Sequence, residues 1–97
     1  MPTYDVDPRF LREYLSLTRQ QRAAFRRARD RFVAALKAGR PFGAGLGVRE
    51  MTDHPGIYEF RFSSAGRATF AYGSEARGAD AHVVWRRIGG HEIYREP

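Results

Sequence analysis

The hydrophobic pattern of this chain changes its period once, near Pro41, and this change limits the folds that it can adopt. Across residues 19–38, apolar side chains recur every three or four positions, which is typical of an amphipathic helix. Across residues 57–62, aromatic side chains occupy every second position, which is typical of a strand with one buried face. The order of these two patterns predicts helices followed by a sheet.

Start and stop signals divide the first half of the chain into two helices. Asp7 and Pro8 form a start signal, because aspartate caps a helix and proline fits its first turn. Thr18 can cap a second helix, and Gly39 ends it. We therefore expect an antiparallel helical hairpin over about residues 8–38.

The second half of the chain contains up to four segments with strand character. Residues 57–62 and 67–73 flank a turn at residues 63–66 and predict a β-hairpin. Residues 81–88 begin with apolar side chains on both faces, as expected of a central strand, and a shorter strand is expected at 48–51. The prediction is a single α+β domain over residues 1–97. Its helical hairpin packs on a three- to four-stranded, mainly antiparallel, twisted sheet over about residues 47–95.

The chain is basic, with 17 Lys and Arg against 11 Asp and Glu and a net charge of +6. The segment 19–38 carries seven of the cations and one acid, Asp30. Arginine suits phosphate because two of its N–H groups can bind one anion. The same face could instead be solvated, and an arginine-rich composition also follows from a GC-rich genome. The candidate RNA- or ribosome-binding residues are Arg19, Arg22, Arg26, Arg29, Arg86 and Arg87.

A second group of polar residues is expected on the sheet face away from the aromatic side chains. Arg61 and Arg67 fall there on adjacent strands of the hairpin, where they could share one phosphate or remain solvated and paired with Glu59. If the C-terminal segment folds back beside the hairpin, His91 and Tyr94 would join the two arginines. The pattern then predicts an anion site with an imidazole and a phenol.

Three motifs in this order resemble the RelE/ParE superfamily of bacterial toxins from type II toxin–antitoxin systems. They are GIYEFRF at 56–62, GRATFAY at 66–72 and VVWRRIGGHEIY at 83–94. The resemblance implies a small α+β toxin that an antitoxin holds inactive and that cleaves messenger RNA in the ribosomal A site. Members of the ParE branch instead poison DNA gyrase. The functional positions that the resemblance implies are Arg67, His91 and Tyr94, with Arg61 on the preceding strand and Glu50 where some members place an acid.

These residue types suit RNA cleavage by attack of the RNA's own 2′-hydroxyl. His91 could accept or donate a proton near neutral pH, and Glu50 is the second candidate for the base. Arg61 and Arg67 would stabilise the charge on the phosphorane, while Tyr94 could stack on a base or share in proton transfer. No metal or other cofactor is expected, because the histidines are few and scattered.

Two other functions stay open: a ParE-like gyrase inhibitor and a non-catalytic basic module that binds RNA or an acidic partner. The expected partners are messenger RNA, the ribosome and an acidic antitoxin in a hetero-oligomer, because an acidic protein would neutralise the basic field. No membrane partner is expected, since no apolar stretch is long enough to cross a bilayer. The N-terminus lacks the pattern of a signal peptide, so a cytoplasmic location is expected.

Overall fold

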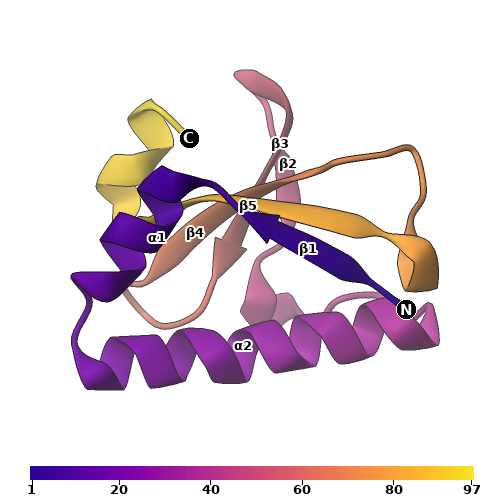
Figure 1. Ribbon diagram of the computed structural model, residues 1–97, viewed down its shortest axis with the longest axis horizontal. Coiled ribbons are helices and arrows are strands. Elements are labelled where there is room, and N and C mark those ends of the chain that lie inside the picture. Colours follow the sequence, from indigo (N-terminus) through magenta and orange to yellow (C-terminus); the bar gives the residue numbers. More distant parts are fainter.

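The computed structural model describes all 97 residues and contains two α-helices and a five-stranded sheet (Figure 1). Three short 3₁₀ segments, η1 to η3, connect or follow these elements. No helix is long and apolar enough to span a membrane. In chain order the elements are β1 Thr3–Val6, α1 Pro8–Leu15, α2 Arg19–Ala38, η1 Ala44–Leu46, β2 Arg49–Met51, β3 His54–Arg61, β4 Arg67–Tyr72, η2 Gly78–Asp80, β5 His82–Gly89 and η3 His91–Arg95.

The sheet is mixed, with the strand order β1-β5-β4-β3-β2. The pairs β2–β3, β3–β4 and β4–β5 are antiparallel, as the sequence predicts, but β1 runs parallel to β5. The prediction of a mainly antiparallel sheet is therefore confirmed in part, but the helix-first order and the three or four strands are not exact, because a fifth strand precedes the helices and runs parallel to β5. Residues 3–6 are too short and too exposed to carry a clear period, and they form a strand because β5 supplies backbone partners.

The helix boundaries follow from their caps. The Asp7 carboxylate accepts a hydrogen bond from the Arg9 N–H at 2.8 Å and starts α1. Thr18 and Gln21 exchange hydrogen bonds of 3.1 and 2.8 Å in a capping box that starts α2. Gly39 ends α2 with a φ of 63°, a conformation that glycine adopts at little cost. These three predicted signals are confirmed.

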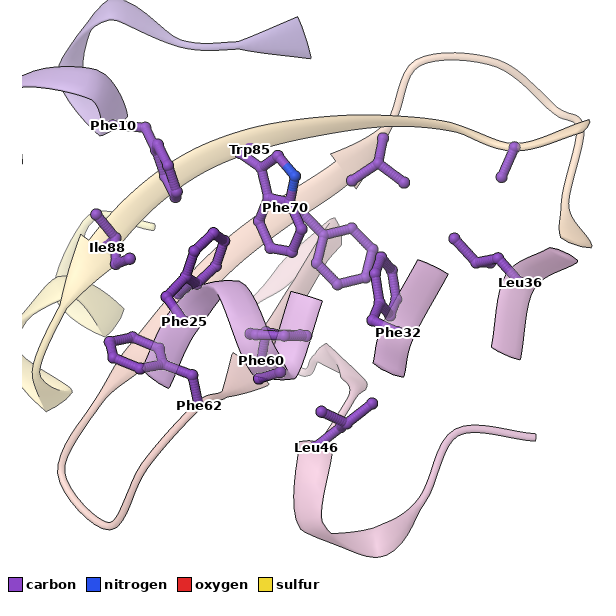
Figure 2. Close-up of a cluster of buried hydrophobic side chains, with 14 residues drawn as sticks. Phe10, Phe25, Phe32, Leu36, Leu46, Phe60, Phe62, Phe70, Trp85 and Ile88 are labelled. Atoms are coloured by element: carbon purple, nitrogen blue, oxygen red, sulfur yellow. The ribbon is translucent and has the colours of Figure 1, made fainter. Parts of the chain in front are cut away.

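The core is an aromatic layer between α2 and one face of the sheet (Figure 2). Phe25 and Phe32 of α2 meet Phe60 of β3, Phe70 of β4 and Trp85 of β5, with ring centroids 5.1 to 5.9 Å apart. Burying each such side chain stabilises the fold by about 1.5–3 kcal/mol. Since side chains alternate along a strand, the residues between these aromatics project from the opposite face of the sheet.

The C-terminal segment is fastened to the body of the protein by arginines of β5. The Arg87 guanidinium donates to the Glu13 carboxylate of α1 at 2.8–3.1 Å and to the Glu96 carbonyl at 2.7 Å. Arg86 donates to the Pro97 carbonyl at 3.0 Å, and Ile93 of η3 is fully buried. These contacts fix η3 against the sheet.

Replacing Glu13 with alanine is expected to loosen this attachment, because the Arg87 side chain, only 12% exposed, then loses its carboxylate partner. The free energy of unfolding should fall by about 2 kcal/mol, the size of a hydrogen bond to a charged group. Amide hydrogens of residues 91–95 should exchange faster while those of α2 stay protected. Chemical denaturation and hydrogen-exchange mass spectrometry measure the two effects.

Asp30→Ala is the matched control, since the Asp30–Arg29 ion pair lies on the surface, with 70% and 39% of the two side chains exposed. Its loss should change the free energy of unfolding by less than about 1 kcal/mol. Equal losses for the two variants, or unchanged exchange in η3 of Glu13→Ala, would contradict this account of the C-terminal segment.

Candidate active site

A polar hollow of about 250 Å³ lies on the sheet face opposite α2. Side chains from β2, β3, β4 and η3 meet there, although their residues are far apart in sequence. The hollow contains three guanidiniums and one carboxylate, which leaves an excess of two positive charges beside the imidazole. Its lining residues are Gly47, Arg49, Glu59, Arg61, Arg67, His91 and Tyr94.

Arg61 and Arg67 stand opposite each other in the β3–β4 register. Two like charges at such a position repel, and backbone carbonyls offset this repulsion. Arg61 donates to the carbonyls of Ala44 and Gly45 at 3.0 and 3.2 Å. The φ of Gly47 is 57°, and a side chain there would come within 3.4 Å of the Arg61 Cβ. This is an ordinary van der Waals distance, so the left-handed φ is what favours glycine at this position.

The Arg67 guanidinium leaves one of its edges available to a ligand. Its Nη1 donates to the carbonyls of Ser63, Ser64 and Gly66 at 2.9 to 3.2 Å. No protein group accepts from its Nε or Nη2, and these two N–H groups form the edge that binds two oxygens of one phosphate. The turn between β3 and β4 thus orients Arg67 as an anion-binding group.

His91 and Tyr94 project from the same side of η3, since residues three apart eclipse one another in a 3₁₀ helix. Their ring centroids are 5.7 Å apart in an edge-to-face arrangement. His91 is exposed and Tyr94 is half-buried. The Glu92 carboxylate accepts a hydrogen bond from the Gly90 N–H at 3.0 Å, which lowers the pKa of Glu92 and holds the turn that leads into η3. The segment thus folds back beside the hairpin, which is the condition under which the sequence places His91 and Tyr94 near Arg61 and Arg67.

Burial raises the pKa of Tyr94 to about 12, and the nearby Glu59 carboxylate adds to the increase, while Arg67, Arg49 and Arg61 oppose it. The phenol is therefore neutral at physiological pH. It can donate a hydrogen bond to an anion or stack on a base, but it does not act as a proton acceptor there.

Sequence reasoning missed two residues of the hollow, Arg49 and Glu59. Arg49 Nε lies 3.1 Å from the Glu59 carboxylate, so Glu59 forms its ion pair with Arg49 and not with the arginines of the hairpin. The Glu59 side chain is 19% exposed, and its carboxylate is the only one that lines the hollow. The sequence did contain a signal for Glu59, because a residue two positions before Arg61 on a strand lies on the same face as Arg61.

Glu50 does not join the other predicted catalytic residues. It follows Arg49 on β2 and therefore projects from the other face of the sheet. Its carboxylate accepts a hydrogen bond from the Gly56 N–H at 2.8 Å, and it lines a separate hollow with Tyr58 and Tyr72. No cluster of three or more His, Cys, Asp or Glu side chains in the chain is arranged to hold a metal ion.

The predicted RNA-binding arginines of α2 lie on the other side of the sheet from the hollow. Arg22 donates to the Leu17 carbonyl, Arg26 donates to the Tyr14 hydroxyl, and Arg29 pairs with Asp30. Arg19 has no protein partner for its side chain. These residues form a surface separate from the hollow.

Of the two arginines of β5, Arg87 donates hydrogen bonds to the Glu13 carboxylate and the Glu96 carbonyl. The hydrogen bond to Glu13 raises the pKa of Arg87 above its usual value. Arg86 keeps an exposed side chain whose Nε binds the Pro97 carbonyl. Arg87 therefore orders the C-terminal segment. Its sequence context did not indicate this role.

The ionisation of Tyr94 provides a test of the site's electrostatics. Carbon NMR of tyrosine labelled at Cζ should show Tyr94 still neutral at about pH 10, where an ordinary tyrosine is half ionised; Tyr94→Phe assigns the resonance. Glu59→Gln should lower the pKa of Tyr94, because it removes a negative charge that raises it. Glu75→Gln, outside the hollow, should leave it unchanged. An ordinary titration of Tyr94 would show that the phenol is not in this environment.

The sequence matches no protein-family model and no curated protein. Several solved structures nevertheless share the fold over nearly their whole length. A chain of the RelB–RelE antitoxin–toxin complex from Methanococcus jannaschii is 11% identical, with a TM-score of 0.65 over 95% of this chain and 98% of that one. YafQ from Escherichia coli is 9% identical, with a TM-score of 0.65 over 97% and 98% of the two chains.

The YoeB/ParE toxin from Agrobacterium tumefaciens is 12% identical, with a TM-score of 0.64 over 92% of this chain and 98% of that one. Identities this low establish the arrangement of the backbone and not the activity. The chain therefore has the fold of the RelE/ParE toxins. This confirms, at the level of the fold, the resemblance that its three sequence motifs indicate.

Proposed function

We propose that this protein is the toxin of a type II toxin–antitoxin system and cleaves messenger RNA on the ribosome. The observation that carries the proposal is the convergence of Arg61, Arg67, His91 and Tyr94 on one hollow. The first two come from a hairpin and the last two from a segment that reaches it only in the folded chain. A cationic hollow with an exposed imidazole at its margin suits a phosphodiester.

The reaction is an internal transfer of the phosphoryl group. The 2′-oxygen of the RNA forms a bond to phosphorus as it loses its proton, and the bond from phosphorus to the 5′-oxygen breaks. The 5′-oxygen takes up a proton, so the products are a 2′,3′-cyclic phosphate and a 5′-hydroxyl. The protein must supply one proton acceptor, one proton donor and cations for the charge that grows on the phosphorane.

The residues of the hollow divide these tasks. The free Nε–Nη2 edge of Arg67 binds the phosphorane oxygens, and Arg61 adds positive charge beside it. His91 exchanges a proton with the RNA from the exposed margin. Tyr94, which stays neutral, donates a hydrogen bond or stacks on a base. Glu59 replaces Glu50 as the second candidate for the base, because it is the carboxylate in the hollow.

The basic surface of α2 serves a different task in this proposal. Its arginines bind ribosomal RNA while the hollow on the opposite sheet face receives the message. Each phosphate contact adds affinity that falls with salt. An acidic antitoxin forms a hetero-oligomer with the toxin and neutralises this charge, and one of the solved structures with this fold is described as an antitoxin–toxin complex. A ribosomal substrate places the protein in the cytoplasm.

Single-turnover cleavage of messenger RNA on programmed ribosomes tests the assignment. His91→Ala should lower the cleavage rate by roughly 10²–10⁴-fold, the usual contribution of a proton-transferring side chain. Arg67→Ala should cost roughly 10²–10³-fold, as expected for one preorganised donor to a developing charge. Arg40→Ala is the matched control: it removes an exposed arginine that does not line the hollow.

Intact message with wild-type protein would reject the nuclease. Inhibition of DNA supercoiling without RNA cleavage would then identify a gyrase inhibitor. RNA binding that depends on the α2 arginines and is insensitive to His91→Ala would identify a non-catalytic module.

The chemistry of attack has its own test. A message with a single 2′-deoxynucleotide on the 5′ side of the scissile bond should resist cleavage at that bond, because the attacking hydroxyl is missing. Cleavage of the all-ribose message should yield a 2′,3′-cyclic phosphate, identified by mass spectrometry. Cleavage of the deoxy-substituted bond would show that water, and not the RNA, is the nucleophile.

A further inference from the structure

A second polar hollow, of about 370 Å³, lies on the α2 face of the sheet, at the end of the aromatic layer. Tyr58 continues the row of Phe60 on β3, and Tyr72 continues the row of Phe70 on β4. The two phenylalanines are fully buried, whereas the two tyrosines are partly exposed. Figure 1 shows the turn between β2 and β3 projecting away from α2, which leaves this end of the layer uncovered. We call this hollow the tyrosine pocket; with the two tyrosines it is lined by Glu50, Gly56, Glu75 and Arg77.

The core holds the two tyrosine rings of the pocket in place. Their planes stand at 79° to each other, with centroids 5.2 Å apart. Phe70 stacks on Tyr58 at 5.3 Å and meets Tyr72 edge to face at 5.5 Å. Since β3 lies between β4 and β2, Phe70 covers one face of Tyr58 and the other face is turned toward β2. That second face is the one that a ligand can reach.

A guanidinium of the chain itself already lies on the other tyrosine. Arg77 Cζ is 3.9 Å from the centroid of the Tyr72 ring. The Arg77 Nη1 donates to the carbonyls of Ser74 and Ala76 at 2.9 and 3.1 Å, which holds the side chain over the ring. The electron-rich face of an aromatic ring attracts such a cation. One tyrosine of the pair thus holds the kind of group that a partner could supply to the other.

Two carboxylates of the tyrosine pocket have no cation partner. Glu50 stands opposite Tyr58 in the β2–β3 register, so their side chains share a face, with Cβ atoms about 4.5–5.5 Å apart. The Glu50 carboxylate accepts a hydrogen bond only from the Gly56 N–H, at 2.8 Å. Neither Glu50 nor Glu75 takes part in an ion pair, although the chain carries more cations than acids. Two carboxylates and one guanidinium leave the pocket negative, which favours a cationic ligand.

A planar guanidinium fits this set of groups. It can lie on the free face of Tyr58 while two of its N–H groups bind the Glu50 carboxylate. An ammonium group is a compact, strongly hydrated charge and offers no flat surface to the ring. The two carboxylates would repel a phosphate, and they would repel the carboxylate of free arginine for the same reason. The pocket therefore favours an arginine within a polypeptide over lysine, free arginine or nucleic acid.

We propose that the tyrosine pocket binds an arginine side chain of a partner protein, with the guanidinium on the face of Tyr58 and against the Glu50 carboxylate. The interaction goes beyond the proposed function. The pocket lies on the other face of the sheet from the hollow that contains His91 and Tyr94, and the two sites share no residue. Failure of either proposal therefore leaves the other standing.

The test uses the whole chain and a blocked tripeptide, acetyl-Gly-Arg-Gly-amide, whose only charge is the guanidinium. Its addition to millimolar concentration should shift the NMR signals of the Tyr58 ring and the Glu50 amide and leave those of His91 and Tyr94 unchanged. The uncharged tripeptide with glutamine in place of arginine should cause no shifts. The tripeptide with lysine, and free arginine, should each bind at least about twofold more weakly.

Glu50→Gln tests the carboxylate, because it removes the charge and keeps an acceptor for the Gly56 N–H. It should weaken binding of the arginine tripeptide about twofold to fivefold, as expected for an exposed ion pair. Asp53→Asn is the matched control: it removes one exposed carboxylate of the neighbouring turn, outside the tyrosine pocket, and should leave binding unchanged.

Tyr58→Leu tests the ring and should weaken binding about threefold, because the cation loses its aromatic partner. Tyr58→Phe keeps the ring and should bind as the wild-type protein does. If Tyr58→Leu does not fold, the exposed position of Glu50 leaves Glu50→Gln as the decisive variant.

Four results would overturn the proposal. Equal shifts with the arginine and glutamine tripeptides would exclude recognition of the guanidinium. Equal weakening by Glu50→Gln and Asp53→Asn would show that the overall charge, and not the pocket, attracts the peptide. Shifts of the Tyr58 ring with guanosine monophosphate at lower concentration than with the arginine tripeptide would identify a nucleotide site. Self-association in analytical ultracentrifugation that Glu50→Gln abolishes would identify a second copy of the chain as the occupant.

Discussion

The aromatic contact between α2 and the sheet is the interaction on which the candidate site depends. Phe25 and Phe32 bury Phe60 and Trp85, and this burial decides which face of β3 is inside. Because strand side chains alternate, a shift of one residue would exchange the two faces. Arg61 would then point into the core, where an unpaired charge is very costly. The same contact that stabilises the fold thus exposes the cations of the hollow.

The second requirement is a firm C-terminal segment. His91 and Tyr94 belong to a short 3₁₀ helix, and such helices are marginal by themselves. The buried side chain of Ile93 and the contacts of Arg87 with Glu13 and Glu96 hold this one in place. An arginine that looks like a phosphate ligand in the sequence therefore serves the site indirectly, by ordering the segment that carries the imidazole and the phenol.

The two basic regions of the molecule face different directions, and this separation shapes the proposals. The hollow holds a few cations at defined positions, which suits the recognition of one phosphate. The α2 surface is broader, and its cations do not converge on one anion. Such a surface suits the phosphate backbone of a large nucleic acid. β1 borders the α2 surface and not the hollow.

Local signals in the sequence determined the helix caps at Asp7, Thr18 and Gly39 and the pairing of the hairpin strands, because these depend on neighbouring residues and on a period of two. They also placed Arg61 and Arg67 on one face. Tertiary structure alone decided that β1 pairs with β5, that Arg49 enters the hollow while Glu50 lies outside it, and that the Glu13 carboxylate binds Arg87. Each of these depends on contacts between residues distant along the chain, and no local pattern encodes such contacts.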